Sequence, residues 1–421
     1  MKRRKFIQSG GPLLLSTAAI SAFPFQGFAS NTAIPAISTS LIKPIRDRIV
    51  PIRAEERHIR QNQAKALMIE NKIEAIFLEG GTSMNYFTGI HWGRSERMFA
   101  CILPQQGEPV FISPKFEEAR AREQVGEVKL VTWEEHESPF EVVRQILKEK
   151  NLLSANIAME ETTRYFITEG IQKTIPDIRI SSASVVTAGC RSIKSAHEIE
   201  LMQIANDMAA EVYKWAVPQL KEGMTEAMFA SIISNGFEQF GVEGGALVLF
   251  GDASALPHGH LKENKLKQGD IVLIDGGCTV EGYESDITRT TVFGNPTKKM
   301  KTIFSIVSQA QEAALQTASL KGVRAEEVDA SARKVISEAG YGPGYKYFTH
   351  RLGHGIGMDG HEWYYLVGGN KRTLMPGNMF SDEPGIYLVG EFGIRIEDEL
   401  LITPEGARLL LPKAKSLEQM F

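Results

Sequence analysis

The chain contains 421 residues, of which 43% are hydrophobic and 23% charged, and 47 lysines and arginines are set against 51 aspartates and glutamates. This composition excludes a wholly disordered, collagen-like or disulfide-dense protein, and the length suggests two or three domains. The formal net charge of -4 argues against a nucleic-acid-binding protein, because phosphate binding needs a concentrated basic surface.

The N-terminal segment has the layout of an export signal. Four basic residues, Lys2 to Lys5, precede an apolar stretch that runs to Phe25, and small residues follow at Gly27 and Ala29. The apolar stretch is too short and too interrupted by proline for a stable membrane span. The run Arg3 to Gln8 resembles the twin-arginine signal, so we expect cleavage after Ala29 and export to the periplasm or beyond. The alternative is an uncleaved amphipathic anchor; cleavage would leave a net charge of -8.

Residues 30–50 are predicted to form a linker, because they are rich in Ser, Thr, Ala, Ile and Pro without helical or strand periodicity. From 51 to 192, short apolar runs alternate with amphipathic stretches, which predicts a smaller α/β domain. We expect strands at 75–78, 128–131 and 155–158, helices at 140–150 and 164–174, and a hairpin over 97–113 that turns at Gln105-Gln106-Gly107.

The three cysteines, Cys101, Cys190 and Cys278, lie at wide spacings. At most one disulfide can form among them, and no CxxC pair suggests a thiolate zinc site. They are predicted to be buried thiols.

A second domain is predicted to begin at about residue 193. Ser195 and Glu198 fit a capping box, and apolar residues then recur at helical spacing to Trp215, so a long helix opens this domain. Another helix is expected at Thr225–Phe240. Five of the nine histidines lie within 258–361, a concentration that suggests metal chemistry.

Two glycine-bearing hairpins in this domain each offer a pair of carboxylates. In the first, an apolar strand ends in Asp275 and a glycine-rich turn, and a second strand carries Asp286. In the second, Glu383 and Glu397 occupy corresponding places. Carboxylates on neighbouring strands about 4.8 Å apart repel unless a cation lies between them. Taken alone, the Asp-Gly sequence is more often a plain turn and each glutamate is more often on a solvated strand face, but two such pairs together indicate a site.

His354 lies between the hairpins and is flanked by Gly353 and Gly355. Flanking glycines allow a close backbone approach, which suits a ligand at the edge of a site. A lone histidine in this position is more often structural. Beside four carboxylates it becomes the natural nitrogen ligand.

The five candidate ligands occur in the contexts Ser-Asp-Ile-Thr-Arg-Thr, Gly-His-Gly-Ile-Gly, Glu-Pro-Gly-Ile-Tyr and Arg-Ile-Glu-Asp. In order and context they resemble the pita-bread metallopeptidases, in the branch that contains prolidase and aminopeptidase P. The resemblance is strong over 192–412 and weaker over 51–192. It implies an α+β fold, with a creatinase-like N-terminal α/β domain at 51–192 followed by a pita-bread catalytic domain at 193–421. It also implies a homo-oligomer, most simply a dimer.

Carried over by position, the resemblance implies a site for two divalent metal ions. Asp286 and Glu397 would bridge the metals, Asp275 would hold one of them, and His354 with Glu383 would hold the other. This oxygen-rich ligand set suits Mn²⁺ first, with Co²⁺ or Zn²⁺ also compatible.

The resemblance also implies catalytic roles around a metal-bound hydroxide. Glu383 would accept the proton, and His361 and His258 would contact the substrate carbonyl and the developing oxyanion. Arg395 would orient the bridging carboxylates. For His258 a solvated loop position is the alternative.

The family's substrates are peptides with proline in the second position, so the implied reaction is hydrolysis of the Xaa-Pro bond with release of the N-terminal residue. One departure concerns the residues after His361-Glu362, where many relatives have a small residue or proline and this chain has Trp363-Tyr364-Tyr365. Dipeptidase and aminopeptidase activity therefore both stay open. Two other classes share the fold, namely creatinase-type amidinohydrolases without metal ligands and catalytically silent binding modules. Retention of all five ligands argues against both, and the acidic charge argues against a nucleic-acid partner.

Overall fold

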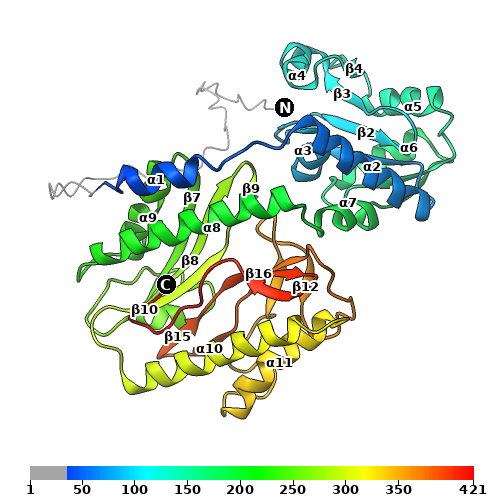
Figure 1. Cartoon of the computed structure of the whole chain (residues 1–421). Helices are drawn as coiled ribbons and strands as arrows, with labels where there is room; N and C mark the ends of the chain where they lie inside the picture. Colours follow the sequence, from blue (N-terminus) through cyan, green and yellow to red (C-terminus); the bar gives the residue numbers. More distant parts are fainter. Residues whose placement is uncertain (1–35) are drawn as a thin grey trace, which may run out of the picture. The chain divides into compact units, whose positions relative to one another are not determined.

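The computed structural model describes residues 36–421, so the predicted signal peptide lies outside the described residues. Two groups of elements follow α1 (Thr39–Arg46) in chain order (Figure 1). The first group consists of α2 (Ala54–Glu70), β1 (Ala75–Glu79), α3 (Thr82–Thr88), β2 (Ala100–Pro104), β3 (Val110–Pro114), α4 (Glu118–Val125), β4 (Leu130–Trp133), α5 (Pro139–Glu149), β5 (Asn156–Met159), α6 (Tyr165–Thr174), β6 (Arg179–Ser182) and α7 (Ser184–Arg191).

These elements form a six-stranded mixed sheet in the order β4-β3-β2-β1-β5-β6. β2 pairs antiparallel with both β1 and β3, whereas the pairs β3 with β4, β1 with β5 and β5 with β6 are parallel. Helices cover the sheet and enclose two apolar cores. The structure confirms the predicted hairpin, helices and strands of this region, with β4 beginning two residues later than expected.

The predicted linker is wrong where the structure describes it, because it contains the helix α1. Ile37 is buried in the core of the second domain, and Arg48 pairs with Glu200 at 2.9 Å. The helix is eight residues long, and a few isoleucines spaced along this segment carry its packing. So short a stretch gives little periodicity to detect.

The second group consists of α8 (Ala196–Ala216), α9 (Glu226–Phe240), β7 (Glu243–Phe250), β8 (Ile271–Val280), β9 (Tyr283–Glu284), β10 (Ile287–Val292), α10 (Lys298–Ala318), α11 (Ala325–Glu338), β11 (Gly353–Gly355), β12 (Glu362–Leu366), β13 (Met379–Asp382), β14 (Gly385–Leu388), β15 (Phe392–Arg395), β16 (Asp398–Thr403) and β17 (Gly406–Leu409). Both predicted helices are confirmed. The capping box at the start of α8 is present, since Ser195 Oγ accepts from the Glu198 N–H and Glu198 Oε2 accepts from the Ser195 N–H.

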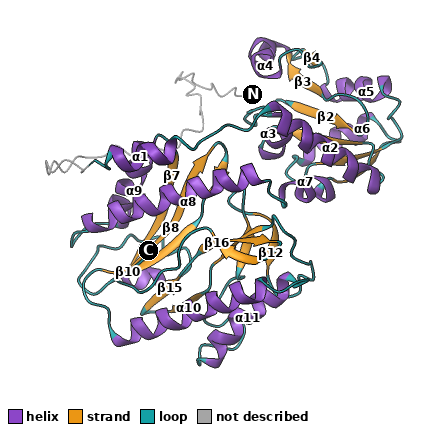
Figure 2. Cartoon of the chain, in the orientation of Figure 1, coloured by secondary structure: helices purple, strands orange, loops and turns teal. Residues whose placement is uncertain are grey.

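The strands of the second domain lie between helix layers (Figure 2). β10, β8 and β7 form one antiparallel sheet to which β9 adds, and β12-β11-β13-β16-β17 form another. α8 and α9 cover the sheet of β10, β8 and β7. α10 and α11 pack against strands of the C-terminal part, β12 to β17, around a separate apolar core. An antiparallel bridge between Thr288 and Glu397 connects the two carboxylate-bearing segments. This bridge positions the site described below.

The Asp-Gly turn predicted in the first hairpin is wrong. β8 continues through Gly276 and Gly277, and the chain reverses at Glu281 and Gly282, both with positive φ. A Cβ added to Gly277 would lie 2.0 Å from the carbonyl oxygen of Ser285. Close backbone approach, and not a turn, therefore requires glycine inside this strand.

The three cysteines are free and buried, as predicted. Within residues 36–421, no helix combines the length and apolar character that crossing a bilayer requires.

Candidate metal centre

A cavity of about 470 Å³ in the second domain brings together all eight residues that the sequence analysis selected. This volume lies within the range of small-molecule sites. Asp275 is on β8 and His354 on β11, and the other three candidate ligands lie just outside strand ends. The selected residues that line the cavity are His258, Asp275, Asp286, His354, His361, Glu383, Arg395 and Glu397.

The candidate ligands form overlapping groups of three. Ligand atoms of Asp275, Asp286 and Glu397 all lie within 4.8 Å of one another, and so do those of His354, Glu383 and Glu397. Glu397 belongs to both groups. Asp286 also forms a third group with His354 and His361.

Thr288, which the sequence analysis missed, orders the first group. Its hydroxyl donates to Glu397 Oε2 at 2.6 Å and lies 2.9 Å from Asp275 Oδ1. Arg395 Nη2 donates to Asp275 Oδ2 at 2.5 Å, and its Nε donates to Thr288 Oγ1 at 3.1 Å. Thr288 is two residues beyond Asp286, so strand alternation from a known ligand was the available signal.

Crowding and burial disturb the ionisation of these carboxylates. Burial, followed by the neighbouring carboxylates, raises the pKa of Asp286 and of Glu397 well above the usual range. Burial also acts to raise the pKa of Asp275, but Arg395 outweighs it and that pKa is lowered. Carboxylates this close are stable as anions only with compensating cations. Oxygen donors with one imidazole therefore fit divalent metal ions.

His354 is buried and has one ring nitrogen available to a metal. Its Nδ1 lies 3.0 Å from the carbonyl oxygen of Gly355, which assigns the proton to Nδ1. Its Nε2 lies 3.4 Å from Glu383 Oε1 and 3.8 Å from Asp286 Oδ2. Burial, with a contribution from His361, lowers the pKa of His354 to about 4, so the ring is neutral at physiological pH.

The two histidines assigned to substrate contact lie on the cavity wall. The His361 ring stacks on that of His354, with ring centroids 3.7 Å apart and planes inclined by 17°. His258 lies in an exposed loop and lines the same cavity.

Glu383 has the properties of a proton acceptor. Burial raises the pKa of Glu383 to about 7, close to physiological pH. Ser381, a residue that the sequence analysis missed, donates from Oγ to Glu383 Oε1 at 3.0 Å and accepts from the His354 N–H at 3.0 Å. One serine thus contacts two of the three members of the second ligand group, His354 and Glu383.

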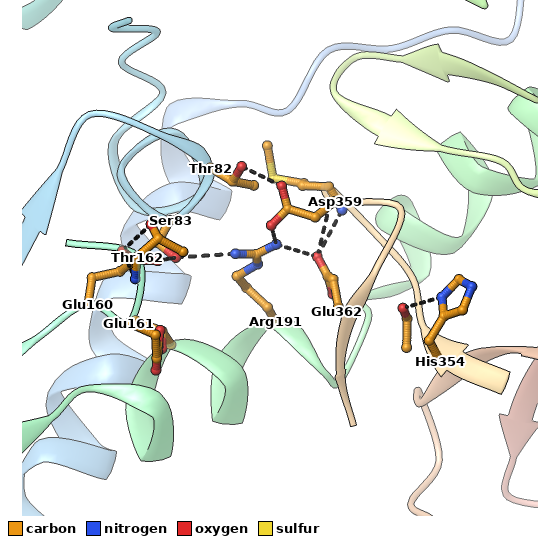
Figure 3. Close-up of polar contacts among 12 residues, drawn as sticks. Thr82, Ser83, Glu160, Glu161, Thr162, Arg191, His354, Asp359 and Glu362 are labelled. Carbon is orange, nitrogen blue, oxygen red and sulfur yellow. Dashed lines mark hydrogen bonds and ion pairs between the residues drawn. The ribbon is translucent and has the colours of Figure 1, made fainter. Parts of the chain in front are cut away.

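The segment from Asp359 to Glu362, which contains His361, is held by ion pairs from Arg191 of the first domain and from Lys194 just beyond it (Figure 3). Arg191, at the end of α7, donates from Nη2 to Asp359 Oδ2 and to Glu362 Oε1, both at 2.6 Å. Lys194 Nζ donates to Glu362 Oε2 at 3.0 Å. The side chains of Arg191, Lys194 and Glu362 are at most 5% exposed.

Further hydrogen bonds complete this anchorage. Thr82 Oγ1, from α3, donates to Asp359 Oδ1 at 2.6 Å, and the Met358 N–H donates to Glu362 Oε1 at 3.0 Å. The loop that carries His361 is therefore fixed from both domains. No local sequence pattern indicated these contacts.

Comparison with known proteins identifies the family. Residues 200–404 match the model of metallopeptidase family M24, and residues 60–193 match the Creatinase/Prolidase N-terminal domain. An uncharacterized peptidase of Schizosaccharomyces pombe is 37% identical over 405 residues, covering 91% of this chain and 87% of that protein. The chain belongs to metallopeptidase family M24.

Solved structures agree with membership of the M24 family. A prolidase from Thermococcus sibiricus is 32% identical with a TM-score of 0.77, covering 84% of this chain and 96% of that chain. Dipeptidase PepE from Mycobacterium ulcerans is 31% identical with a TM-score of 0.80, covering 86% of this chain and 97% of that chain. The α+β pita-bread fold with a creatinase-like first domain is thereby confirmed, and this M24 protein is a metallopeptidase.

Proposed function

We propose that this metallopeptidase hydrolyses the bond between an N-terminal residue and a following proline, with two divalent metal ions bound. The observation that carries this proposal is the pair of ligand groups that share Glu397, next to a Glu383 carboxyl whose pKa is raised to about 7 by burial. The likeness to a prolidase supports the substrate class. Mn²⁺ is the first candidate metal, ahead of Co²⁺ and Zn²⁺.

Five residues would hold the metals: Asp286 and Glu397 between them, and Asp275, His354 and Glu383 on either side. When bound, two divalent ions lower the pKa of a shared water and polarise the scissile carbonyl. Glu383 then accepts a proton and delivers it to the departing proline nitrogen. This delivery is needed because the leaving nitrogen departs as an amine only after it has been protonated.

The histidines on the wall act on the carbonyl. His361 and His258 line the cavity on which the ligands converge, which supports a role for each as a donor to the carbonyl oxygen as negative charge develops. Arg395 and Thr288 keep the carboxylates in position through the hydrogen bonds described above.

The test is a substrate panel with metal-depleted protein to which Mn²⁺ is added back. We expect cleavage of Xaa-Pro dipeptides, Xaa-Pro-Yaa peptides or both. Asp286→Asn should abolish it, whereas the exposed control Asp177→Asn should not. Absence of bound metal and of cleavage, together with consumption of creatine, would instead establish the amidinohydrolase alternative.

We also propose that the protein is exported by a twin-arginine route. The basic residues Lys2 to Lys5 followed by an apolar stretch support this proposal. A reporter fused to residues 1–31 should cross the membrane in folded form. Export solely through the unfolded-chain route would refute it.

A further inference from the structure

A second, smaller cavity of about 160 Å³ lies between the first domain and the turn that joins β8 to β9 in the second domain. It shares no lining residue with the cavity of the metal centre. Its volume is below the range of drug-sized sites, about 300 to 1,000 Å³, so only a small molecule fits. Its charged and polar lining includes Arg57, Arg60, Asn85 and Glu281, and its apolar lining includes Ile52 and Met358.

Two opposite charges in this lining have no partner. Within residues 36–421, the side chains of Arg57 and Glu281 form no ion pair and no hydrogen bond, either with each other or with another residue. Arg60, by contrast, donates from Nη2 to Glu198 Oε1 at 3.2 Å and to the Tyr283 hydroxyl at 2.7 Å. An unpaired cation and an unpaired anion in one small cavity fit a ligand that carries both charges.

The position of Arg57 depends on a close approach to the end of α3. Arg57 lies on α2 and is half-buried. A Cβ added to Gly89, which follows α3 with φ of 77°, would lie 2.6 Å from Cζ of Arg57. The lack of a side chain at Gly89 therefore lets the guanidinium pack against the backbone and fixes it beside the cavity.

The turn that carries Glu281 contains an unusual residue for its conformation. Glu281 and Gly282 alone connect β8 to β9, with φ of 50° and 83°. Two-residue turns with both φ values positive favour Asn-Gly or Asp-Gly, and other residues rarely adopt this conformation. A glutamate here therefore indicates a use for its carboxylate beyond the turn. A Cβ added to Gly282 would lie 3.2 Å from Cε of Met358, so glycine also keeps the cavity open.

We propose that this cavity binds a free α-amino acid with a small side chain, with Arg57 on its carboxylate and Glu281 on its ammonium group. In an amino acid both groups are attached to one carbon, so a molecule small enough for the cavity can contact both charges. The side-chain amide of Asn85 offers a further donor to the carboxylate, and Ile52 and Met358 offer apolar surface to the side chain. This inference goes beyond the proposed function, because the cavity is separate from the metal centre.

Isothermal titration calorimetry of the Mn²⁺-loaded protein with L-alanine measures this binding. Propionate lacks the ammonium group and L-alaninamide lacks the carboxylate, so each should bind at least about 10-fold more weakly than alanine, the loss expected for one charge-assisted hydrogen bond. Arg57→Gln and Glu281→Gln should each weaken alanine binding by a similar factor. Asp286→Asn, which removes a candidate metal ligand, should leave the affinity for alanine unchanged.

Arg53→Gln is the matched control. Arg53 directly precedes α2, is exposed and does not line the cavity, so its replacement should not change alanine binding. Absence of alanine binding to the wild type would overturn the inference, and equal binding of propionate and alanine would show a plain anion site and overturn it too. Alanine binding that is lost in Asp286→Asn but kept in Arg57→Gln would place the amino acid at the metal centre instead. None of these results depends on cleavage of an Xaa-Pro bond, so the proposed function is tested separately.

Discussion

Replacing Glu362 with glutamine should destabilise the folded protein by removing one buried negative charge. Glu362 is 3% exposed and receives hydrogen bonds from Arg191 and Lys194. Glutamine keeps the shape and one acceptor oxygen but leaves two cations with less compensation. Uncompensated buried charges are costly in a medium of low dielectric constant.

The magnitude follows from the ionisation of Glu362. Burial acts to raise its pKa, but Lys194 and Arg191 outweigh burial and lower the pKa to about 2, from an ordinary value of 4.5. Because the folded-state pKa is the lower one, the stabilisation is fully present above about pH 5 and is lost as pH falls toward 2. It amounts to about 3 kcal/mol at pH 7 and about 1 kcal/mol at pH 3.

Urea unfolding of metal-free protein at both pH values measures this effect. The difference in unfolding free energy between wild type and Glu362→Gln should be about 3 kcal/mol at pH 7 and should shrink by more than half at pH 3. Glu405→Gln, at an exposed turn, should change stability by less than about 0.5 kcal/mol. A cost below about 1 kcal/mol at pH 7, or an equal cost at both pH values, would refute the reasoning.

Three further predictions concern the metal, the thiols and a glycine. Saturating Mn²⁺ at about 100 times its Kd should stabilise the protein by about 2.7 kcal/mol, seen as a rise in Tm that a chelator reverses, and an unchanged Tm would contradict a metal centre. All three thiols should be unreactive toward a disulfide reagent in the native protein and react once it is unfolded in urea, because burial raises the pKa of each cysteine; a thiol that reacts in the native state would contradict this. Gly353→Ala should lower bound metal, because the new Cβ would lie 1.9 Å from the Ser381 carbonyl oxygen and push β11 from β13, displacing His354. Gly93→Ala, where nothing lies within 4 Å, is its control, and equal metal content in both variants would disprove the steric argument.

Much of the centre could be predicted from sequence because each ligand sits in a short local pattern. Glycine and apolar residues around Asp275, His354 and Glu397 place these residues on strands or next to them, and several carboxylates in one domain indicate a cation. The register of the first hairpin was harder to predict. Glycine both allows turns and permits close approach of strands, and only the position of Ser285 in space shows which use applies at Gly277.

Contacts between distant parts of the chain could not be predicted. Arg191 and Glu362 are 171 positions apart, and Thr82 and Asp359 are 277 positions apart. No periodic pattern links such residues, because each contact depends on how distant segments are brought together in the folded chain. Thr288 was predictable only in part. The face of the strand on which it lies follows from strand alternation, but its partner Glu397 belongs to another segment.

The ion pairs of Arg191 have a consequence for how the two domains can evolve or be separated. They make the first domain a structural part of the substrate cavity, because the loop that carries His361 is held at Asp359 and Glu362 from α7. Exchanging the first domain for another of the same fold would preserve the centre only if the incoming domain supplied a guanidinium at the end of its last helix. Residues 193–195 separate the six-stranded sheet of the first domain from the sheets of the second. Dividing the enzyme there would nevertheless separate Arg191 from Asp359 and Glu362.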